Sequence, residues 1–307
     1  MKNFINLGNI NKNDLRKIID HAKSQKKKRS NLNKSAIDPD AYLKGKTLIM
    51  IFEKSSTRTR ISFELAMKQL GGQIVVLNSK ESHYGIGDES VHDTAKVLSQ
   101  YGDIVVMRSI RHEYFLEFSE HLDIPIINGL TNLSHPCQIM SDIMTFEELK
   151  GPITNKKIAW LGDGNNVVYS LIEASVQFNF ELTIACPKQL TPSKKILQWA
   201  KSKNGKILIT NDPNKAASLA DCVMTDKWIS MGNKVNVKKK KKLLKPYQVN
   251  NKIMKLAKTD AIFMHCLPAN RGEEVTNEVM DGKQSVVWLE ALNRVHTQKS
   301  IIEWCLK

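Results

Sequence analysis

Residues 47–64, "TLIMIFEKSSTRTRISFE", join an apolar run to a basic, hydroxyl-rich loop and then to a helical pattern. The run "TLIMIF" (47–52) is typical of a strand buried on both faces. After the loop, Ile61, Leu65 and Leu70 recur at helical spacing, and the following Gly71 can end that helix. The stretch therefore predicts a strand, a loop and a helix, which is the repeating unit of parallel α/β folds.

The same alternation continues along the chain. Short apolar, β-branched runs are separated by segments of helical length, and these runs are "GQIVVLN" (72–78), "DIVVMRS" (103–109), "IPIINGL" (124–130), "KIAWLGDG" (157–164), "ELTIACP" (181–187), "KILITND" (206–212), "DCVMTD" (221–226), "AIFMHCLP" (261–268) and "SVVWLEA" (285–291). "GPITNK" (151–156) breaks the pattern because Gly-Pro ends the preceding helix. We expect two doubly wound parallel-sheet domains, residues 1–150 and 151–307.

The composition supports a two-domain protein. The chain has 307 residues, of which 41% are hydrophobic, and length over about 150 is a prior for domain number. No run of about 18 apolar residues is present, and the N-terminus lacks a signal-peptide core, so a cytoplasmic location is expected. The five cysteines are far apart without a CxxC pair, and they are interpreted as reduced thiols rather than as a disulfide framework or a zinc site.

The charge is strongly positive, at +15. Such an excess suggests an anionic partner such as nucleic acid, but much of it is local, in the Lys-rich stretches 23–34 and 234–245. Neither stretch interleaves aromatic residues on which bases would stack. We therefore interpret the lysines as solvated helix faces and expect no nucleic-acid partner and no membrane partner.

The loop after the first strand has the chemistry of a phosphate site. In open parallel sheets, ligands bind beyond the carboxyl ends of the strands. The loop also precedes a helix, whose first N–H groups favour an anion. Ser56, Thr57 and Thr59 add hydroxyl donors, and Arg58 can form a planar, charge-assisted fork to phosphate oxygens. The Walker pattern is absent, so a nucleoside triphosphate is not implied.

Two further strand ends carry polar side chains suited to the same ligand. Arg108 follows the third run and can add a cation, although alone it is more often a surface arginine. In "SHPCQ", a following helix would bring His135 and Gln138 to one side, where a neutral imidazole and an amide can polarise a carbonyl. The alternative interpretation of His135 is a helix-capping residue.

Three features of the second half have ordinary explanations as well. "GDGNNV" (162–167) partly matches a dinucleotide fingerprint, but its third glycine is Val167, so no dinucleotide site is predicted. Cys266 has the alternative of a buried strand cysteine, and Asp226 that of a helix cap.

Four motifs together resemble the aspartate/ornithine carbamoyltransferase family. "SSTRTRISFE" (55–64) and "HPCQ" (135–138) are similar to its carbamoyl phosphate motifs, and "DKWISMG" (226–232) and "HCLP" (265–268) to those of its ornithine-specific branch. The resemblance implies that residues 1–150 bind carbamoyl phosphate and residues 151–307 bind ornithine, with the active site in the cleft between them and the C-terminal helix (about 290–307) packing on the first domain.

The resemblance also implies roles for single residues. The carbamoyl phosphate ligands are expected to be Ser56, Thr57, Arg58, Thr59, Arg108, His135, Gln138, Cys266, Leu267 and Arg294, and among them Arg108, His135 and Cys266 are expected to be catalytic. The ornithine ligands are expected to be Asn166, Asp226, Ser230 and Met231. His83, with Tyr84 as the alternative, is expected to reach a neighbouring subunit of a homotrimer or of a multiple of it, and His265 is expected to pack or orient.

The implied reaction is transfer of the carbamoyl group from carbamoyl phosphate to the side-chain amine of L-ornithine, which gives citrulline and phosphate in arginine biosynthesis. A related enzyme acting on putrescine or N-acetylornithine is the alternative. No metal and no organic cofactor are expected. The sequence departs from the family pattern at Asn233 and Lys234, where an acidic residue is common.

Overall fold

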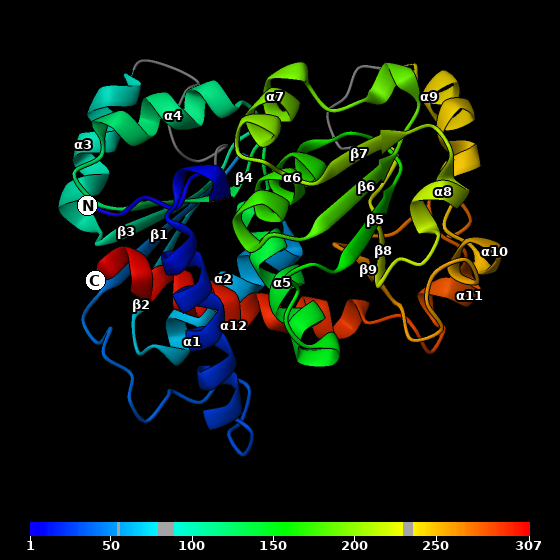
Figure 1. Cartoon of the computed structure of the whole chain (residues 1–307). Helices are drawn as coiled ribbons and strands as arrows, with labels where there is room; N and C mark the ends of the chain where they lie inside the picture. Colours follow the sequence, from blue (N-terminus) through cyan, green and yellow to red (C-terminus); the bar gives the residue numbers. More distant parts are fainter. Residues whose placement is uncertain (54–55, 79–88, 230–235) are drawn as a thin grey trace. The chain divides into compact units, whose positions relative to one another are not determined.

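The computed structural model describes residues 1–53, 56–78, 89–229 and 236–307. The chain divides into two compact units: residues 1–144 with 292–307 form the first, and residues 145–291 the second. Each is an α/β unit with a parallel sheet, as the alternation of apolar runs and helical segments predicts (Figure 1).

The first unit contains a four-stranded sheet in the order β2-β1-β3-β4, in which all pairings are parallel. Its strands are β1 (Thr47–Phe52), β2 (Gln73–Asn78), β3 (Ile104–Arg108) and β4 (Ile126–Leu130). The helices that begin in this unit are α1 (Lys12–Lys28), α2 (Thr57–Gln69), α3 (Val91–Tyr101), α4 (His112–His121) and α5 (Pro136–Lys150). One core cluster packs β-branched and other apolar strand side chains against aromatic residues of α4, among them Ile49, Val105, Met107, Phe115 and Phe118.

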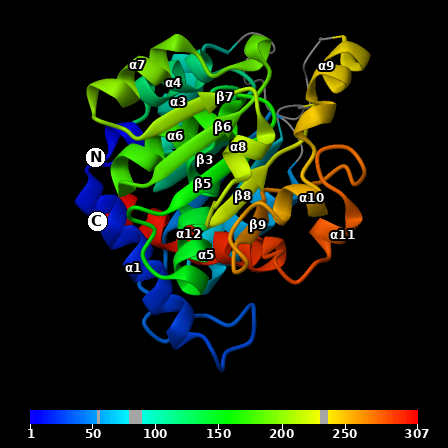
Figure 2. The ribbon, with the colours of Figure 1, turned by 45° about the vertical axis from the view of Figure 1, so that its right-hand side comes forward.

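The second unit contains a five-stranded parallel sheet in the order β7-β6-β5-β8-β9, whose strands lie side by side in Figure 2. The strands are β5 (Lys157–Leu161), β6 (Glu181–Ala185), β7 (Ile207–Thr210), β8 (Cys222–Thr225) and β9 (Ile262–His265). The helices are α6 (Asn166–Phe178), α7 (Lys194–Ser202), α8 (Pro213–Ala217), α9 (Val237–Leu244), α10 (Asn251–Met254), α11 (Asn277–Met280) and the start of α12 (Val287–Leu306). Chain order reverses at β5, where β6 lies on one side and β8 on the other, so this sheet has a topological switch point.

One expected strand is wrong. "SVVWLEA" (285–291) does not form a strand, because α12 begins at Val287 and only Ser285 makes an isolated parallel bridge, to Phe263. A short apolar run fits a buried strand or a buried helix equally well. Here the helix continues for 20 residues, and the negative charge of Glu290 in its first turn interacts favourably with the helix dipole.

Helix α2 begins at Thr57, so residues 57–60 of the expected loop form its first turn. The helix ends before Gly71, as expected, and the φ of +81° at Gly71 is the left-handed value common after helices. No disulfide links the five cysteines, all of which lie in described residues. Among the described residues, no helix has the length and apolar content needed to cross a membrane.

Candidate functional site

In the first unit, two guanidinium groups converge on the hydroxyls at the start of α2. Arg108, the last residue of β3, donates from one terminal nitrogen to Ser56 Oγ at 2.9 Å. Arg294, from α12, donates to Thr59 Oγ1 at 2.9 Å, and Arg108 lies 3.5 Å from the same oxygen. Thr59 is only 1% exposed, so the hydroxyl that both arginines approach is buried. These contacts hold the two cations at the N-terminus of α2, where unpaired N–H groups attract anions.

His135 lies immediately before α5, whose first residue is Pro136. The imidazole is 4% exposed, and burial is the main cause that holds the pKa of His135 well below its usual value of 6.5. The charges of Arg294, Arg108 and Arg58 lower this pKa further. His135 is therefore a neutral imidazole among cations, which suits a donor that polarises a carbonyl without becoming charged.

Gln138 is buried in the first turn of α5, next to His135 in sequence and on the same end of the helix. Its Nε2 donates to Asp142 Oδ1 at 2.8 Å, one turn further along. This bond fixes the orientation of the amide. The N–H of Gln138 donates to the His135 carbonyl at 3.2 Å, and the prediction that the two side chains face one side stays a prediction.

Glu53 is a residue of this group that the sequence analysis missed. Its Oε2 accepts a hydrogen bond from Ser109 Oγ at 3.0 Å and another from the N–H of Ile110 at 2.5 Å. The N–H of Glu53 in turn donates to the Arg108 carbonyl at 3.0 Å. Glu53 therefore ties the end of β1 to the end of β3 and fixes the backbone around Arg108. Neighbouring strands pair Phe52 with Arg108, but no local motif shows this.

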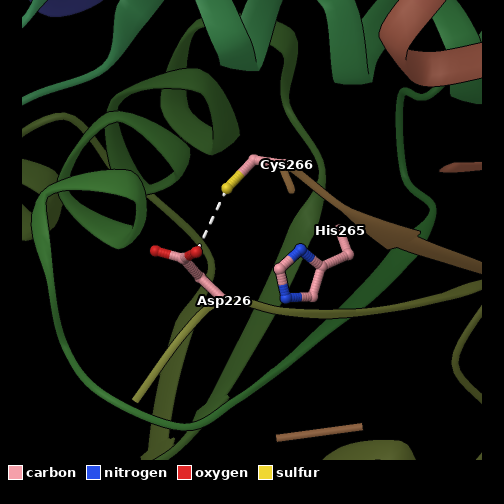
Figure 3. Close-up of side chains that lie close together, drawn as sticks. All are labelled: Asp226, His265 and Cys266. Carbon is pink, nitrogen blue, oxygen red and sulfur yellow. Dashed lines mark hydrogen bonds between the residues drawn. The ribbon is translucent and has the colours of Figure 1, made fainter. Parts of the chain in front are cut away.

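In the second unit, Asp226 and Cys266 meet at the ends of two paired strands. Asp226 follows β8 and Cys266 follows β9, and the last residues of these strands, Thr225 and His265, are in register. The Cys266 thiol donates to Asp226 Oδ1 at a distance of 3.2 Å (Figure 3). Thiol and carboxylate thus form a hydrogen-bonded pair that can exchange a proton with a bound amine.

Asn165 completes the environment of Asp226. Its Nδ2 donates to Asp226 Oδ2 at 2.7 Å, and its Oδ1 accepts from the N–H groups of Val167 and Val168, so it also caps α6. The predicted ligand Asn166 is the first residue of α6, beside this cap. The Asp-Asn contact was not anticipated, although an asparagine just before a helix is a recognisable capping signal.

The turn that carries these asparagines explains the glycines of "GDGNN" without a dinucleotide. Gly162 has φ of +137°, which disfavours any side chain, and a Cβ on Gly164 would lie 2.4 Å from the Leu190 carbonyl oxygen. Both glycines are required by the local backbone. The backbone of this turn therefore explains why the sequence partly resembles a dinucleotide fingerprint.

His265 orients the segment that contains Cys266. Its Nδ1 accepts from the N–H of Leu267 at 2.8 Å, its own N–H donates to Glu290 Oε2 at 2.9 Å, and its Nε2 lies 3.4 Å from Glu274 Oε1. Leu267 has a left-handed φ of +57°, which these contacts stabilise. In Figure 3 the His265 ring lies beside the Asp226–Cys266 pair.

The ligand atoms of Asp226, His265 and Cys266 lie within 4.8 Å of one another, a spacing that can hold a metal ion. A cation there would compete with bonds already formed, because the thiol donates to Asp226 and His265 Nδ1 accepts from Leu267. Hydrogen bonds among the described residues therefore already account for the positions of these three side chains.

The comparisons with known proteins give the family. Residues 2–148 match the domain described as "Aspartate/ornithine carbamoyltransferase, carbamoyl-P binding domain". Residues 154–305 match "Aspartate/ornithine carbamoyltransferase, Asp/Orn binding domain". The chain belongs to the aspartate/ornithine carbamoyltransferase family.

Relatives within this family are similar to the chain over its full length. An ornithine carbamoyltransferase of Rhodopseudomonas palustris is 51% identical over 305 residues, covering 99% of this chain and 96% of that protein. The one of Mesorhizobium japonicum is 48% identical, covering 100% and 99%. Among solved structures, the ornithine carbamoyltransferase from Pyrococcus furiosus has a TM-score of 0.93 at 39% identity, covering 99% and 97% of the two chains. The anabolic enzyme from Campylobacter jejuni has a TM-score of 0.92 at 36% identity, covering 99% of each chain.

Within the family framework, the structure places most of the predicted ligands. Ser56, Thr59, Arg108 and Arg294 are joined by hydrogen bonds, and His135 lies within the influence of three arginines. Asp226 and Cys266 are joined in the second unit. The predicted residues Ser230, Met231, His83 and Tyr84 lie outside the described residues. Contact of any residue with a substrate stays a prediction.

Proposed function

We propose that the protein transfers the carbamoyl group of carbamoyl phosphate to the side-chain amine of L-ornithine, giving L-citrulline and phosphate. The observation that carries this proposal is the thiol–carboxylate pair of Cys266 and Asp226, formed by the two motifs typical of the ornithine-specific branch. The family match over both domains supports it.

The first unit would bind carbamoyl phosphate. Phosphate oxygens would be held by Ser56, Thr57, Arg58 and Thr59 at the start of α2, with Arg108 and Arg294 as further cations. The two guanidiniums already bonded to the hydroxyls of this loop support the assignment, because preorganised donors cost no reorganisation during reaction.

The carbamoyl oxygen would face Arg108, His135 and Thr59. Gln138 would hold the carbamoyl end of the ligand, with Cys266 and Leu267 as further contacts. The neutral state of His135 supports this role, because a neutral donor stabilises a developing oxyanion while it leaves the phosphate charge to the arginines.

The second unit would bind ornithine. Asn166 and Asp226, with Ser230 and Met231, would hold the α-ammonium and α-carboxylate. Ornithine's side-chain ammonium has an ordinary pKa near that of lysine, about 10.4, so a proton must leave before attack. The Cys266–Asp226 pair would orient the side-chain nitrogen and assist this loss.

The reaction then follows from the chemistry of the two ligands. The neutral amine nitrogen attacks the carbonyl carbon, which forms a C–N bond and a tetrahedral intermediate. As the intermediate collapses, the bond between the carbonyl carbon and the bridging phosphate oxygen breaks. The departing phosphate accepts the proton released from nitrogen. Catalysis rests on positioning and on charge stabilisation, without a covalent enzyme intermediate.

The direct experiment measures citrulline formed from carbamoyl phosphate and ornithine, with putrescine, N-acetylornithine and aspartate assayed in parallel for their own products. Product from ornithine, lost in Arg58→Ala, is the expected result. Product from another amine alone would keep the phosphate site and reject the acceptor. No product from any amine would reject the proposal.

Three related properties belong to the same proposal. We propose a homotrimer, a cytoplasmic location and a role in arginine biosynthesis. Sedimentation velocity of the full chain would test the trimer, cell fractionation the location, and growth of an arginine auxotroph carrying the gene the biosynthetic role.

A further inference from the structure

Lysines 238–242 do not form a uniform solvated face. Lys238, Lys239 and Lys242 are exposed, as the sequence predicts, and Lys241 pairs with Glu273. The side chain of Lys240 is only 5% exposed, so the interpretation of the run as solvent-facing lysines is wrong for this residue. A buried lysine is seldom found without a charged partner.

The partner of Lys240 is Asp163 in the turn between β5 and α6. The Nζ of Lys240 lies 2.5 Å from Asp163 Oδ2, and the aspartate side chain is 13% exposed. The Asp163 carbonyl accepts from Trp160 Nε1 at 3.0 Å, so the turn is anchored to β5 at the same residue. This turn also supplies Asn165, the residue that donates to Asp226. Lys240 therefore connects α9 to the backbone that positions the Asp226 environment.

Two other titratable groups bear on this pair. Burial raises the pKa of Asp163, the ammonium of Lys240 opposes that rise, and the carboxylate of Asp226 adds to it. The thiol of Cys186, which follows β6, also lies in the field of Asp163 and has a raised pKa, chiefly because it is buried. Among the described side chains that act on Asp163, the positive charge of Lys240 thus offsets part of the negative charge of the Asp163 and Asp226 carboxylates.

The charge balance matters for the proposed reaction. An ornithine amine must lose its proton before attack, and each uncompensated carboxylate nearby raises the pKa of that amine. With Lys240 present, Asp163 belongs to an ion pair and contributes little net field. Without Lys240, the amine would experience a second negative charge in addition to Asp226.

We infer that Lys240 is a positioning and charge-balancing residue for the amino-acid substrate: its ammonium fixes the turn that carries Asn165 and cancels the charge of Asp163 beside Asp226. The inference rests on the proposed function, since it concerns the protonation of the acceptor amine. As a scale for such an effect, one unit charge at about 8 Å in any protein shifts a pKa by about 0.4 unit in water and about 1.5 units at an effective dielectric constant of ~20.

The test compares Lys240→Met with Lys242→Met, a matched change at an exposed lysine of the same run. The kcat at saturating ornithine, which reports ionisations of the bound complex, is measured from pH 6 to 10, together with KM for ornithine and for carbamoyl phosphate. In Lys240→Met the rising limb is expected to move to higher pH by about 0.5–1.5 units. KM for ornithine is expected to rise about tenfold, because the turn is no longer anchored, while KM for carbamoyl phosphate stays within about twofold. Lys242→Met should match the wild type.

The double variant Asp163→Asn/Lys240→Met separates charge from packing. It removes both charges, so its rising limb should return to within about 0.3 unit of the wild type even if KM for ornithine stays high. Failure of the double variant to restore the limb would overturn the charge argument, as would a Lys240→Met profile that superimposes on the wild type.

Two further variants keep the inference testable if Lys240→Met does not fold. Lys240→Arg keeps the positive charge and should keep the pH profile. Asp163→Asn removes the carboxylate that offsets the Lys240 charge, so the rising limb should move to lower pH. Movement of the Asp163→Asn limb in the opposite direction would reject the inference. A wild-type chain that forms no citrulline rejects the proposed function instead, so the two failures are distinguishable.

Discussion

Replacement of His135 by alanine should lower turnover far more than it weakens binding of carbamoyl phosphate. The imidazole is 4% exposed, and burial with three neighbouring arginines keeps it neutral. Loss of one preorganised donor to an oxyanion costs about 100- to 1,000-fold in kcat. Loss of one neutral hydrogen bond to the ground-state ligand costs about 1 kcal/mol, or ~5-fold in Kd.

The assay separates these two quantities. The kcat comes from citrulline formation at saturating substrates, and the Kd of carbamoyl phosphate from calorimetry or from its effect on Tm. His296→Ala is the matched control: it removes another buried histidine of the first unit, two residues along α12 from Arg294, where side chains do not share a face. It should lower Tm without a comparable loss of kcat.

The pH profile gives a second check of the same prediction. The pKa of His135 is held well below 6.5, so His135 should not titrate near pH 6.5. Any limb of the kcat–pH profile near pH 6.5 in the wild type should therefore also be present in His135→Asn. An unchanged kcat in His135→Ala, or a loss of kcat no greater than the loss of affinity, would refute the assigned role. A limb near pH 6.5 that depends on His135 would refute the neutral imidazole.

Three further predictions concern other parts of the described structure. Glu53→Leu should raise KM for carbamoyl phosphate about tenfold, because the buried Ser109 hydroxyl and the Ile110 N–H lose their shared acceptor, whereas Glu53→Gln keeps an acceptor and should stay within about threefold; equal effects in steady-state kinetics would contradict this. Burial, with the charge of Lys299, lowers the pKa of His296 to about 3, so below pH ~6.5 the unfolded chain binds a proton that the folded chain does not. The free energy of unfolding should therefore fall by about 2 kcal/mol between pH 7 and 5 through His296 alone, and urea denaturation should show a smaller fall in His296→Gln; equal falls would count against it. Cys266→Ala should lower kcat/KM for ornithine about 100-fold, and Cys266→Ser, which keeps a donor for Asp226, should lose less; the reverse order would point to thiolate chemistry rather than orientation.

The sequence predicted most of the features that depend on local rules. The phosphate-site stretch at 53–60 could be assigned because its hydroxyls and Arg58 are contiguous and lie where a strand gives way to a helix. His135 and Gln138 could be identified for the same reason, since residues three apart at the start of a helix are neighbours on its surface. Arg294 is more than 230 residues from Thr59, and only the family resemblance indicated it.

The features that the sequence did not predict depend on which strands become neighbours and which lysine is covered. Glu53 acquires its partners because β1 pairs with β3, a relation that no local pattern contains. Lys240 is one of five identical letters, and only the packing of α9 distinguishes it from Lys239 or Lys242. The run at 285–291 was assigned to the wrong element because short apolar stretches do not discriminate between helix and strand.

The discontinuous composition of the first unit affects how the protein is made. Residues 1–144 leave the ribosome first, but their unit also contains residues 292–307, including Arg294, whose partner is Thr59, and Lys299, which pairs with the buried Asp38. At ~5–20 residues per second, synthesis of the intervening segment 145–291 delays residues 292–307 by about 7–30 s. The first unit is therefore completed only after the second has been synthesised, and a chain truncated before residue 292 lacks a cation of the predicted phosphate site.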